Sequence, residues 1–235
     1  MIKEASPTTY GLLGLLAVRS WTGYELTRQM HRSLRFVWSS SEGHLYREQK
    51  RLVELGWASL EREQVGERHR NRYTITPDGR RALTDWLGTE PGEPHFEVEG
   101  ILRIFYGDQG TVADLTASME ATAEAARGML REMVGIVDEY LADGGPLSML
   151  EQGIGGQDQE RLEFRGRVQF PERLHVIALV IDITTQLLAD IATFFSATAE
   201  EAKSWTNAKD PALTPMTRRR LEAIRDRYSA LSAPD

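Results

Sequence analysis

Three helix-start signals lie within the first 45 residues and constrain this chain more than any other feature. Ser6 is an N-cap residue followed by a proline, which suits the first position of a helix. Thr22 and Glu25 have the spacing of a capping box, and Ser39 and Glu42 repeat that spacing. Each signal precedes an apolar or amphipathic run. The pattern therefore predicts three short helices in succession.

The third predicted helix, over residues 39–57, has two chemically different faces. At about 100° per residue, one side carries His44, Tyr46, Arg47, Lys50, Arg51 and Glu54, and the other carries Leu45, Gln49, Leu52 and Gly56. Arg and Lys reach guanine edges and phosphates when such a helix enters a DNA major groove. A charged face that is merely solvated is the alternative interpretation of this helix taken alone.

Two strand-like stretches follow the third helix. Residues 57–64 and 70–76 alternate in polarity, and the link between them contains the glycine that a hairpin turn needs. The tip and the returning strand carry Arg68, His69, Arg70 and Arg72. A basic hairpin directly after a helix of this kind is typical of a wing that lies along a phosphate backbone or enters the minor groove. An ordinary exposed hairpin is the alternative, but the order of the elements favours the wing.

Charge divides the chain into two parts of opposite sign. Residues 1–90 hold 14 Lys and Arg against 11 Asp and Glu, whereas residues 91–235 hold 14 against 24. Such asymmetry indicates a basic binding module joined to an acidic module with a different task.

A last helix is predicted over 216–231, and the arginines at its start are more typical of a solvated or acid-paired cluster than of a DNA contact. The predicted domains are 1–90, a connecting segment 91–110, and 111–235.

The acidic part predicts long helices. Residues 111–141 lack proline and place apolar residues at alternating steps of three and four, as in a coiled-coil seam. A second seam runs through 174–195, in a helix that is apolar on its other sides too. Such seams pack within a subunit or against a partner, and a reader of palindromic DNA needs a twofold partner. We therefore predict a homodimer interface formed by Val112, Leu115, Met119, Met133, Leu174, Ile177, Ile181 and Leu188.

Composition and motifs argue against several other classes of protein. The chain has no cysteine, which excludes disulfides and thiolate chemistry, and it has no recognisable catalytic motif, so we expect no enzyme activity and no cofactor. His175 and Asp182 are too far apart on one helix to ligate a metal together, and no metal site is predicted. Asp182, Gln186 and Asp190 would form a polar stripe on the apolar stretch 174–195, which disfavours a membrane span. A cytoplasmic protein is expected.

Four stretches together resemble a known family. The order LLGLL (12–16), GYELTRQM (23–30), HLYREQKRLVELGWA (44–58) and NRYTITPDGRRALTDWL (71–87) is similar to the PadR-like family of bacterial transcriptional regulators. The resemblance covers the first ninety residues. It implies a mainly α fold with a small β-hairpin, in which an N-terminal winged helix-turn-helix precedes a C-terminal α-helical dimerisation domain. One departure is Gln49, where many members have an apolar residue. Gln49 is thus expected either to be partly exposed or to be hydrogen-bonded to another helix.

The resemblance also implies a function. It predicts a repressor that binds inverted-repeat double-stranded DNA as a homodimer and is released by a small, often aromatic or hydrophobic, effector. Trp38, Trp86 and Trp205 are candidate walls for such an effector, although a plain core position is the favoured interpretation of each. A winged-helix protein-interaction module without DNA binding is the alternative. The residues predicted to contact DNA are Ser41, His44, Tyr46, Arg47, Lys50, Arg51, Arg68, His69, Arg70 and Arg72.

Overall fold

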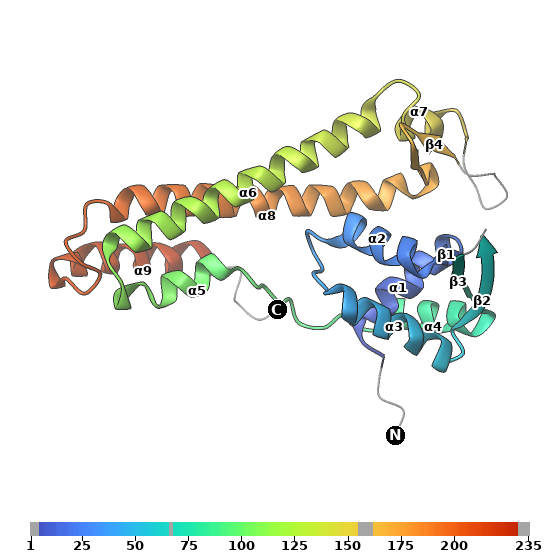
Figure 1. Ribbon diagram of the computed structural model, residues 1–235. Coiled ribbons are helices and arrows are strands. Elements are labelled where there is room, and N and C mark those ends of the chain that lie inside the picture. Colours follow the sequence, from blue (N-terminus) through green and yellow to red (C-terminus); the bar gives the residue numbers. More distant parts are fainter. Residues whose placement is uncertain (1–4, 66–67, 155–161, 230–235) are drawn as a thin grey trace. The chain divides into compact units, whose positions relative to one another are not determined.

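The structure is a computed structural model that describes residues 5–65, 68–154 and 162–229 (Figure 1). It divides into two compact units, Met1–Pro94 and His95–Asp235. The boundary between the units falls within the predicted connecting segment 91–110. Residues 91–94 belong to the first unit and residues 95–110 to the second.

The first unit is a small helical domain with one antiparallel sheet. Its elements are α1 (Pro7–Val18), β1 (Trp21–Thr22), α2 (Gly23–Leu34), α3 (Glu42–Glu54), β2 (Ala58–Val65), β3 (Arg68–Ile75) and α4 (Pro77–Leu87). The strands lie in the order β1-β3-β2, and β2 pairs with β3 from Ala58 opposite Ile75 to Val65 opposite Arg68. The helix order and the hairpin match the predicted winged helix-turn-helix. The two-residue strand β1 was too short for any sequence pattern to predict.

The helix starts in this unit follow from their capping residues. The Ser6 and Thr22 side chains accept hydrogen bonds from the backbone of Thr9 and Glu25, and both capping boxes are complete. Helix α3 begins later than predicted. Its N-cap is Ser41 rather than Ser39, because the Ser41 hydroxyl accepts a hydrogen bond from the His44 N–H at 3.3 Å.

The core of the first unit lies where α1, α2 and α3 meet. Fully buried leucines from all three helices fill it, namely Leu12, Leu13, Leu16, Leu26, Leu45 and Leu52. Trp21 closes one side, with its indole N–H donating to the Leu15 carbonyl at 2.9 Å. Trp86 of α4 stacks on Tyr10 with 4.7 Å between ring centroids, and Trp38 donates to the Thr8 hydroxyl. Both tryptophans are therefore engaged in packing contacts.

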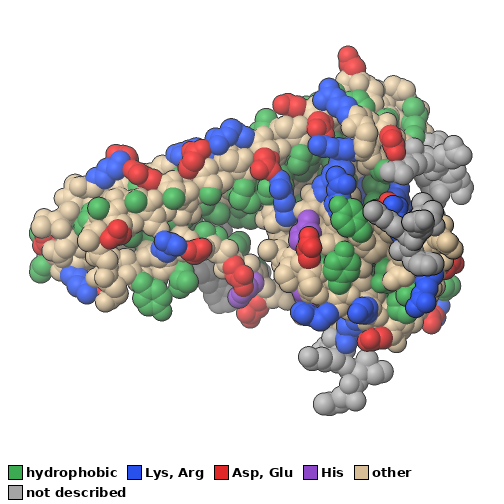
Figure 2. All heavy atoms as spheres, viewed as in Figure 1, with side chains coloured by type: hydrophobic (Ala, Val, Ile, Leu, Met, Phe, Trp, Pro, Cys, Tyr) green, Lys and Arg blue, Asp and Glu red, His purple; other side chains and the backbone are tan. Residues whose placement is uncertain are grey.

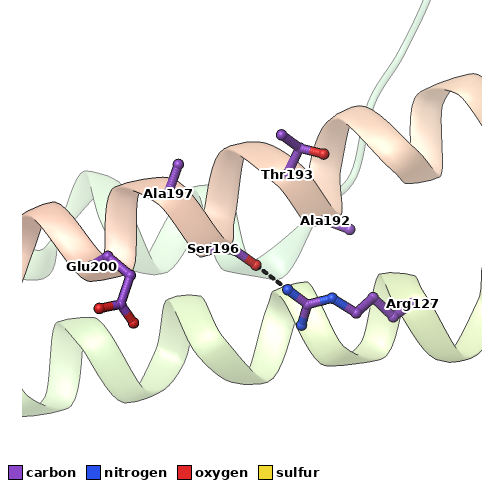
Figure 3. Close-up of a pocket in the computed structure, with 6 residues that line it drawn as sticks. All are labelled: Arg127, Ala192, Thr193, Ser196, Ala197 and Glu200. Carbon is purple, nitrogen blue, oxygen red and sulfur yellow. Dashed lines mark hydrogen bonds between the residues drawn. The ribbon is translucent and has the colours of Figure 1, made fainter.

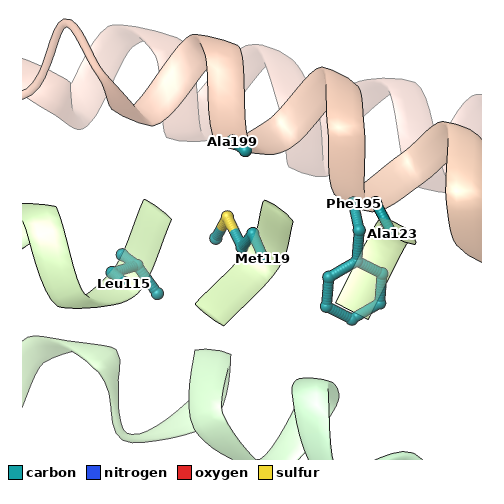
Figure 4. Close-up of a cluster of buried hydrophobic side chains, with 5 residues drawn as sticks. All are labelled: Leu115, Met119, Ala123, Phe195 and Ala199. Carbon is teal, nitrogen blue, oxygen red and sulfur yellow. The ribbon is translucent and has the colours of Figure 1, made fainter. Parts of the chain in front are cut away.

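The second unit is built on two long helices. Its elements are α5 (Glu99–Phe105), η1 (Gly107–Gln109), α6 (Val112–Leu141), α7 (Pro146–Glu151), β4 (Glu163–Phe164), β5 (Arg167–Val168), η2 (Pro171–Arg173), α8 (Leu174–Ala202), η3 (Pro211–Leu213) and α9 (Thr214–Tyr228). Helices α6 and α8 pack along each other (Figure 1). Leu115, Met119 and Ala123 of α6 form a buried cluster with Phe195 and Ala199 of α8 (Figure 4).

Helix α5 lies close against this pair of helices. A Cβ on Gly100 would come within 2.4 Å of the Thr122 hydroxyl and 2.9 Å of the Phe195 ring, so this approach requires a glycine. Trp205 packs against the same cluster, as a core residue does. The ordered part of the predicted connecting segment is thus a component of the second unit's core.

The two predicted seams face each other within one chain, and the dimer interface that we assigned to them stays a prediction. Of the eight residues assigned to a dimer interface, Leu115, Met119, Met133, Leu174 and Leu188 are buried, and Val112, Ile177 and Ile181 are half-buried. Leu115 and Met119 belong to the buried cluster that joins α6 to α8. The heptad pattern indicates which face of a helix is covered, but it does not say whether the cover comes from the same chain.

A second apolar face of α8 remains exposed. Val176, Val180, Ile183, Leu187 and Phe194 follow steps of four and three, with Asp190 completing the series, and their exposed fractions are between 39% and 55%. We call these five apolar residues the outer face of α8. Figure 2 shows hydrophobic side chains along the surface of the long helices. The stretch Pro171–Ala202 is long and apolar enough to cross a membrane by length and composition, and 17% of its most apolar window is buried.

Candidate nucleic-acid interface

Helix α3 presents the two faces that the sequence predicted. Leu45, Gln49 and Leu52 are fully buried, whereas Arg47 and Lys50 are exposed and Tyr46 has 40% of its surface exposed. His44 and Arg51 are partly exposed at the edges of this face. Ser41 is exposed at the N-terminus of the helix, where its oxygen is the cap. Six predicted contact residues therefore belong to one solvent-facing stretch, which we call the recognition face: Ser41, His44, Tyr46, Arg47, Lys50 and Arg51.

Helix α3 is anchored to the first helix by Glu48. The carboxylate of Glu48 accepts hydrogen bonds from the hydroxyls of Ser6, at 3.3 Å, and of Thr9. These two residues form the N-terminal cap of α1, where a negative charge also interacts favourably with the helix dipole. Glu48 thus links the side of α3 to the start of α1.

A second anchor joins α3 to α2 through Gln49. Its side-chain amide donates to the Gly23 carbonyl at 3.1 Å and to the Thr27 hydroxyl at 2.8 Å. Of the two alternatives for this residue, the hydrogen-bonded one is confirmed, because Gln49 has no exposed surface. The recognition face is therefore held by polar contacts to two different helices.

The wing carries the remaining predicted residues. Arg70 is exposed on β3. Arg72 instead forms an ion pair with Glu63 on the neighbouring strand, and about a third of each side chain is exposed. The hydrogen bond that Arg72 donates to the Glu63 carboxylate raises the pKa of Arg72, so the charge of Arg72 is stabilised by a protein partner. This pairing weakens the case for Arg72 as a DNA contact. The side chains of Arg68 and His69 lie outside the described part of the structure.

Two exposed residues of α2 were missed by the sequence reasoning. Tyr24 is 67% exposed, and Arg28, one turn later, is also exposed. In a helix-turn-helix, the helix before the recognition helix crosses the phosphate backbone, and its first turns are the part that meets DNA. The spacing of a tyrosine and an arginine four residues apart, directly after the Thr22 capping box, was the signal available in the sequence.

The described part of the second unit includes two open grooves. One, of about 360 Å³, lies between α6 and α8, where Arg127 donates a hydrogen bond to Ser196 beside several small side chains (Figure 3). Another, of about 430 Å³, lies between α5 and the start of α6 and includes Leu102 and Tyr106. Within the described ranges, no three His, Asp or Glu side chains are grouped as metal ligands. Arg220, in the basic start of α9, pairs with Glu201 at 2.6 Å.

The arrangement of α2, α3 and the hairpin defines a winged helix-turn-helix domain, and comparisons with known proteins agree. Residues 12–85 match the model of the transcriptional regulator PadR-like family. The negative transcriptional regulator PadR of Bacillus subtilis (strain 168) is 23% identical over 148 residues, which are 62% of this chain and 81% of that protein. The match thus relates residues 12–85 to the PadR-like family of transcriptional regulators, which are DNA-binding proteins and not enzymes.

Solved structures extend the similarity of fold into the second unit. Bacillus subtilis PadR in complex with operator DNA has a TM-score of 0.61 at 17% identity, and the match covers 83% of this chain and 98% of that chain. The same protein in complex with p-coumaric acid has a TM-score of 0.55 at 18% identity and covers 86% of this chain and all of that chain. At these identities the likeness concerns the fold.

Proposed function

We propose that this protein is a sequence-specific repressor that binds an inverted-repeat operator in the cytoplasm as a homodimer and is released by a small effector. The recognition face of α3 carries this proposal. It presents Tyr46, Arg47 and Lys50 to solvent, and the helix beneath is fixed to α1 and α2. Anchoring of this kind suits direct reading of bases, because contacts to base edges require a well-defined helix position.

The repressor role is supported by a relative. The similar protein of Bacillus subtilis is named a negative transcriptional regulator, and its structure is known with operator DNA. A repressor of this kind binds a defined site tightly enough to exclude other proteins from it. We infer that the operator has twofold symmetry, since dimers of helix-turn-helix proteins bind two half-sites about one helical turn apart.

The homodimer is supported by the outer face of α8. Five large apolar side chains in a heptad series, from Val176 to Phe194, lie on the surface of an isolated chain. A membrane is a poor cover for this helix, because Asp190 lies within the apolar series and Asp182 and Gln186 lie beside it. A second copy of the same face would bury it with twofold symmetry, as an isologous interface requires.

The effector is proposed from chemistry and from the same relative. Bacillus subtilis PadR is known in complex with p-coumaric acid, a small aromatic carboxylate. The groove beside Arg127 offers a guanidinium next to small side chains, and the groove at Tyr106 offers an aromatic wall. Phenolic acids are therefore the first compounds to test. An effector should raise the melting temperature of the protein and weaken its binding to the operator at the same concentration.

The first experiment measures binding to DNA from the upstream region of the protein's own gene. A sequence-specific reader should bind this DNA more tightly than unrelated DNA, with log affinity falling steeply against log salt. Arg47→Ala and Lys50→Ala should each weaken operator binding by about 1 to 3 kcal/mol if the side chains contact bases. Arg219→Ala removes the same charge from exposed α9 and should leave the affinity unchanged.

Two outcomes would contradict the proposal. Absence of binding at low salt would favour the protein-interaction module, which has a winged helix but no use for DNA. Full operator affinity in both Arg47→Ala and Lys50→Ala would move the reading surface away from α3.

A further inference from the structure

We propose that Gln49 is a positioning residue that sets the spacing between α2 and α3, so that both helices meet DNA in register. The inference rests on the proposed function, since it concerns how the same surface reads an operator. Gln49 would affect operator binding without touching DNA, because its side chain has no exposed surface.

The geometry ties the two helices at two points. The Gln49 amide nitrogen donates both to the carbonyl of Gly23 at 3.1 Å and to the hydroxyl of Thr27 at 2.8 Å, one turn apart on α2. Two bonds from one nitrogen to successive turns restrict sliding of α3 along α2. They also restrict rotation, because hydrogen bonds weaken steeply when their angle departs from linear.

Each residue that directly follows a member of this hydrogen-bonded contact in the sequence is exposed to solvent. Tyr24 and Arg28 directly follow the two acceptors on α2, and Lys50 directly follows Gln49 on α3. A Cβ on Gly23 would lie 2.9 Å from the Gln49 side-chain oxygen and 3.9 Å from the Tyr46 ring. The two helices therefore approach each other closely at this glycine. A shift at Gln49 would change the distance between Arg28 and Lys50, and hence the fit to phosphates and bases together.

The amide is a costly choice for stability alone. Within the described residues, the side-chain oxygen of Gln49 is buried without a hydrogen-bond partner. A buried acceptor left unpaired loses its bonds to water, whereas a pair of apolar side chains of similar shape is nearly neutral or stabilising. Apolar contacts are less directional, so the benefit of the amide lies in the defined geometry.

The test separates geometry from stability. Gln49→Leu combined with Thr27→Val replaces both side chains of the contact with apolar ones of similar size. We expect the double variant to melt within about 3 °C of the unaltered protein. Its affinity for non-operator DNA should be unchanged, while its operator affinity falls roughly tenfold. Thr27→Val alone removes one hydrogen bond and should lower operator affinity by about threefold. This single variant keeps the test decisive if Gln49→Leu impairs folding.

The control is Ile75→Val, a core truncation on β3 that does not touch this contact. It should lower stability and leave the ratio of operator to non-operator affinity unchanged. The positioning role is overturned if the double variant and Thr27→Val both keep the ratio of the unaltered protein, or if their ratio falls only as far as in Ile75→Val. If the unaltered protein itself shows no preference for the operator, the proposed function fails, and this inference fails with it.

Discussion

Glu25 shows how a single side chain closes the start of α2 beside the recognition face. One of its carboxylate oxygens accepts the backbone N–H and the hydroxyl of Thr22, each at 2.9 Å. Burial alone would raise the pKa of Glu25, but the hydrogen bonds from Thr22 and the charges of Arg19 and Arg72 outweigh it and lower the pKa below 4.5. The ionised form is therefore the one that the fold stabilises.

This lowered pKa predicts a defined acid sensitivity. A carboxylate with a depressed pKa contributes stability that is present above its unfolded value and is lost as the pH falls through its folded value. Below about pH 4.5, the melting temperature of the unaltered protein should fall more steeply than that of Glu25→Gln, which lacks the titration. Thermal melts between about pH 3 and 7 measure this. Glu90→Gln, at an exposed position, is the control and should follow the unaltered protein. Parallel curves for Glu25→Gln and the unaltered protein would contradict the prediction.

At the residue scale, the limits of sequence reasoning are visible in Gln49 and Arg72. Helical spacing placed Gln49 on the inner face, but only the packing of α2 supplied its partners, so two alternatives stayed open. Arg72 was assigned to DNA with the other basic wing residues. Its pairing with Glu63 depends on β-strand register, in which Arg72 lies opposite Glu61 and next to Glu63. A hairpin pattern does not determine that register when the turn is not known.

At the element scale, α8 has three faces with different uses. One face packs toward α6, the outer face exposes Val176 to Phe194, and the third carries the polar side chains of Asp182 and Gln186, which hydrogen-bond to each other at 2.8 Å. A helix that is apolar on two sides and covered on one needs a further partner. The polar third face orients the helix by limiting which side can be buried.

A charge on the outer face should therefore separate the proposed dimer without unfolding the chain. Ile183 is 52% exposed, so Ile183→Lys meets solvent in a monomer but a desolvated surface in a dimer. We expect sedimentation to change from dimer to monomer, with the helical circular dichroism retained. Ala178→Lys adds the same charge at an exposed position outside the apolar series and is the matched control. An Ile183→Lys protein that sediments as the unaltered one would refute this interface.

The elements themselves were largely predictable, and the reason is local. Caps at Ser6 and Thr22 mark helix starts within one or two residues, and proline-free heptads mark the length of α6. What covers a helix face is a long-range property. For that reason the sequence left open whether the seams pack within the subunit or against a partner. It also did not single out the outer face of α8 among the apolar sides of that helix.

At the scale of the whole molecule, the distribution of charge constrains how it binds DNA. The chain has a net charge of −7, yet its first ninety residues carry an excess of cations. Charges of the second unit that lie beyond about 10 Å from the phosphates are largely screened at 0.1 M salt. If the recognition face meets DNA as proposed, the local cations Arg47, Lys50 and Arg70 set the affinity more than the net charge does. The acidic remainder would then limit binding to unrelated polyanions.

A twofold assembly makes a quantitative prediction that links α8 to α3. Each bound half-site neutralises its own set of phosphates, and the slope of log affinity against log salt is about −0.9 per phosphate contact. A dimer on a full operator uses two such sets, so Ile183→Lys should bind with roughly half the slope of the unaltered protein. It should also lose the preference for two half-sites over one. Ala178→Lys should keep both properties. The contrary outcome is an Ile183→Lys protein that is monomeric on DNA and shows the same slope as the unaltered protein. One recognition face would then make all the phosphate contacts, and the palindrome would not be required.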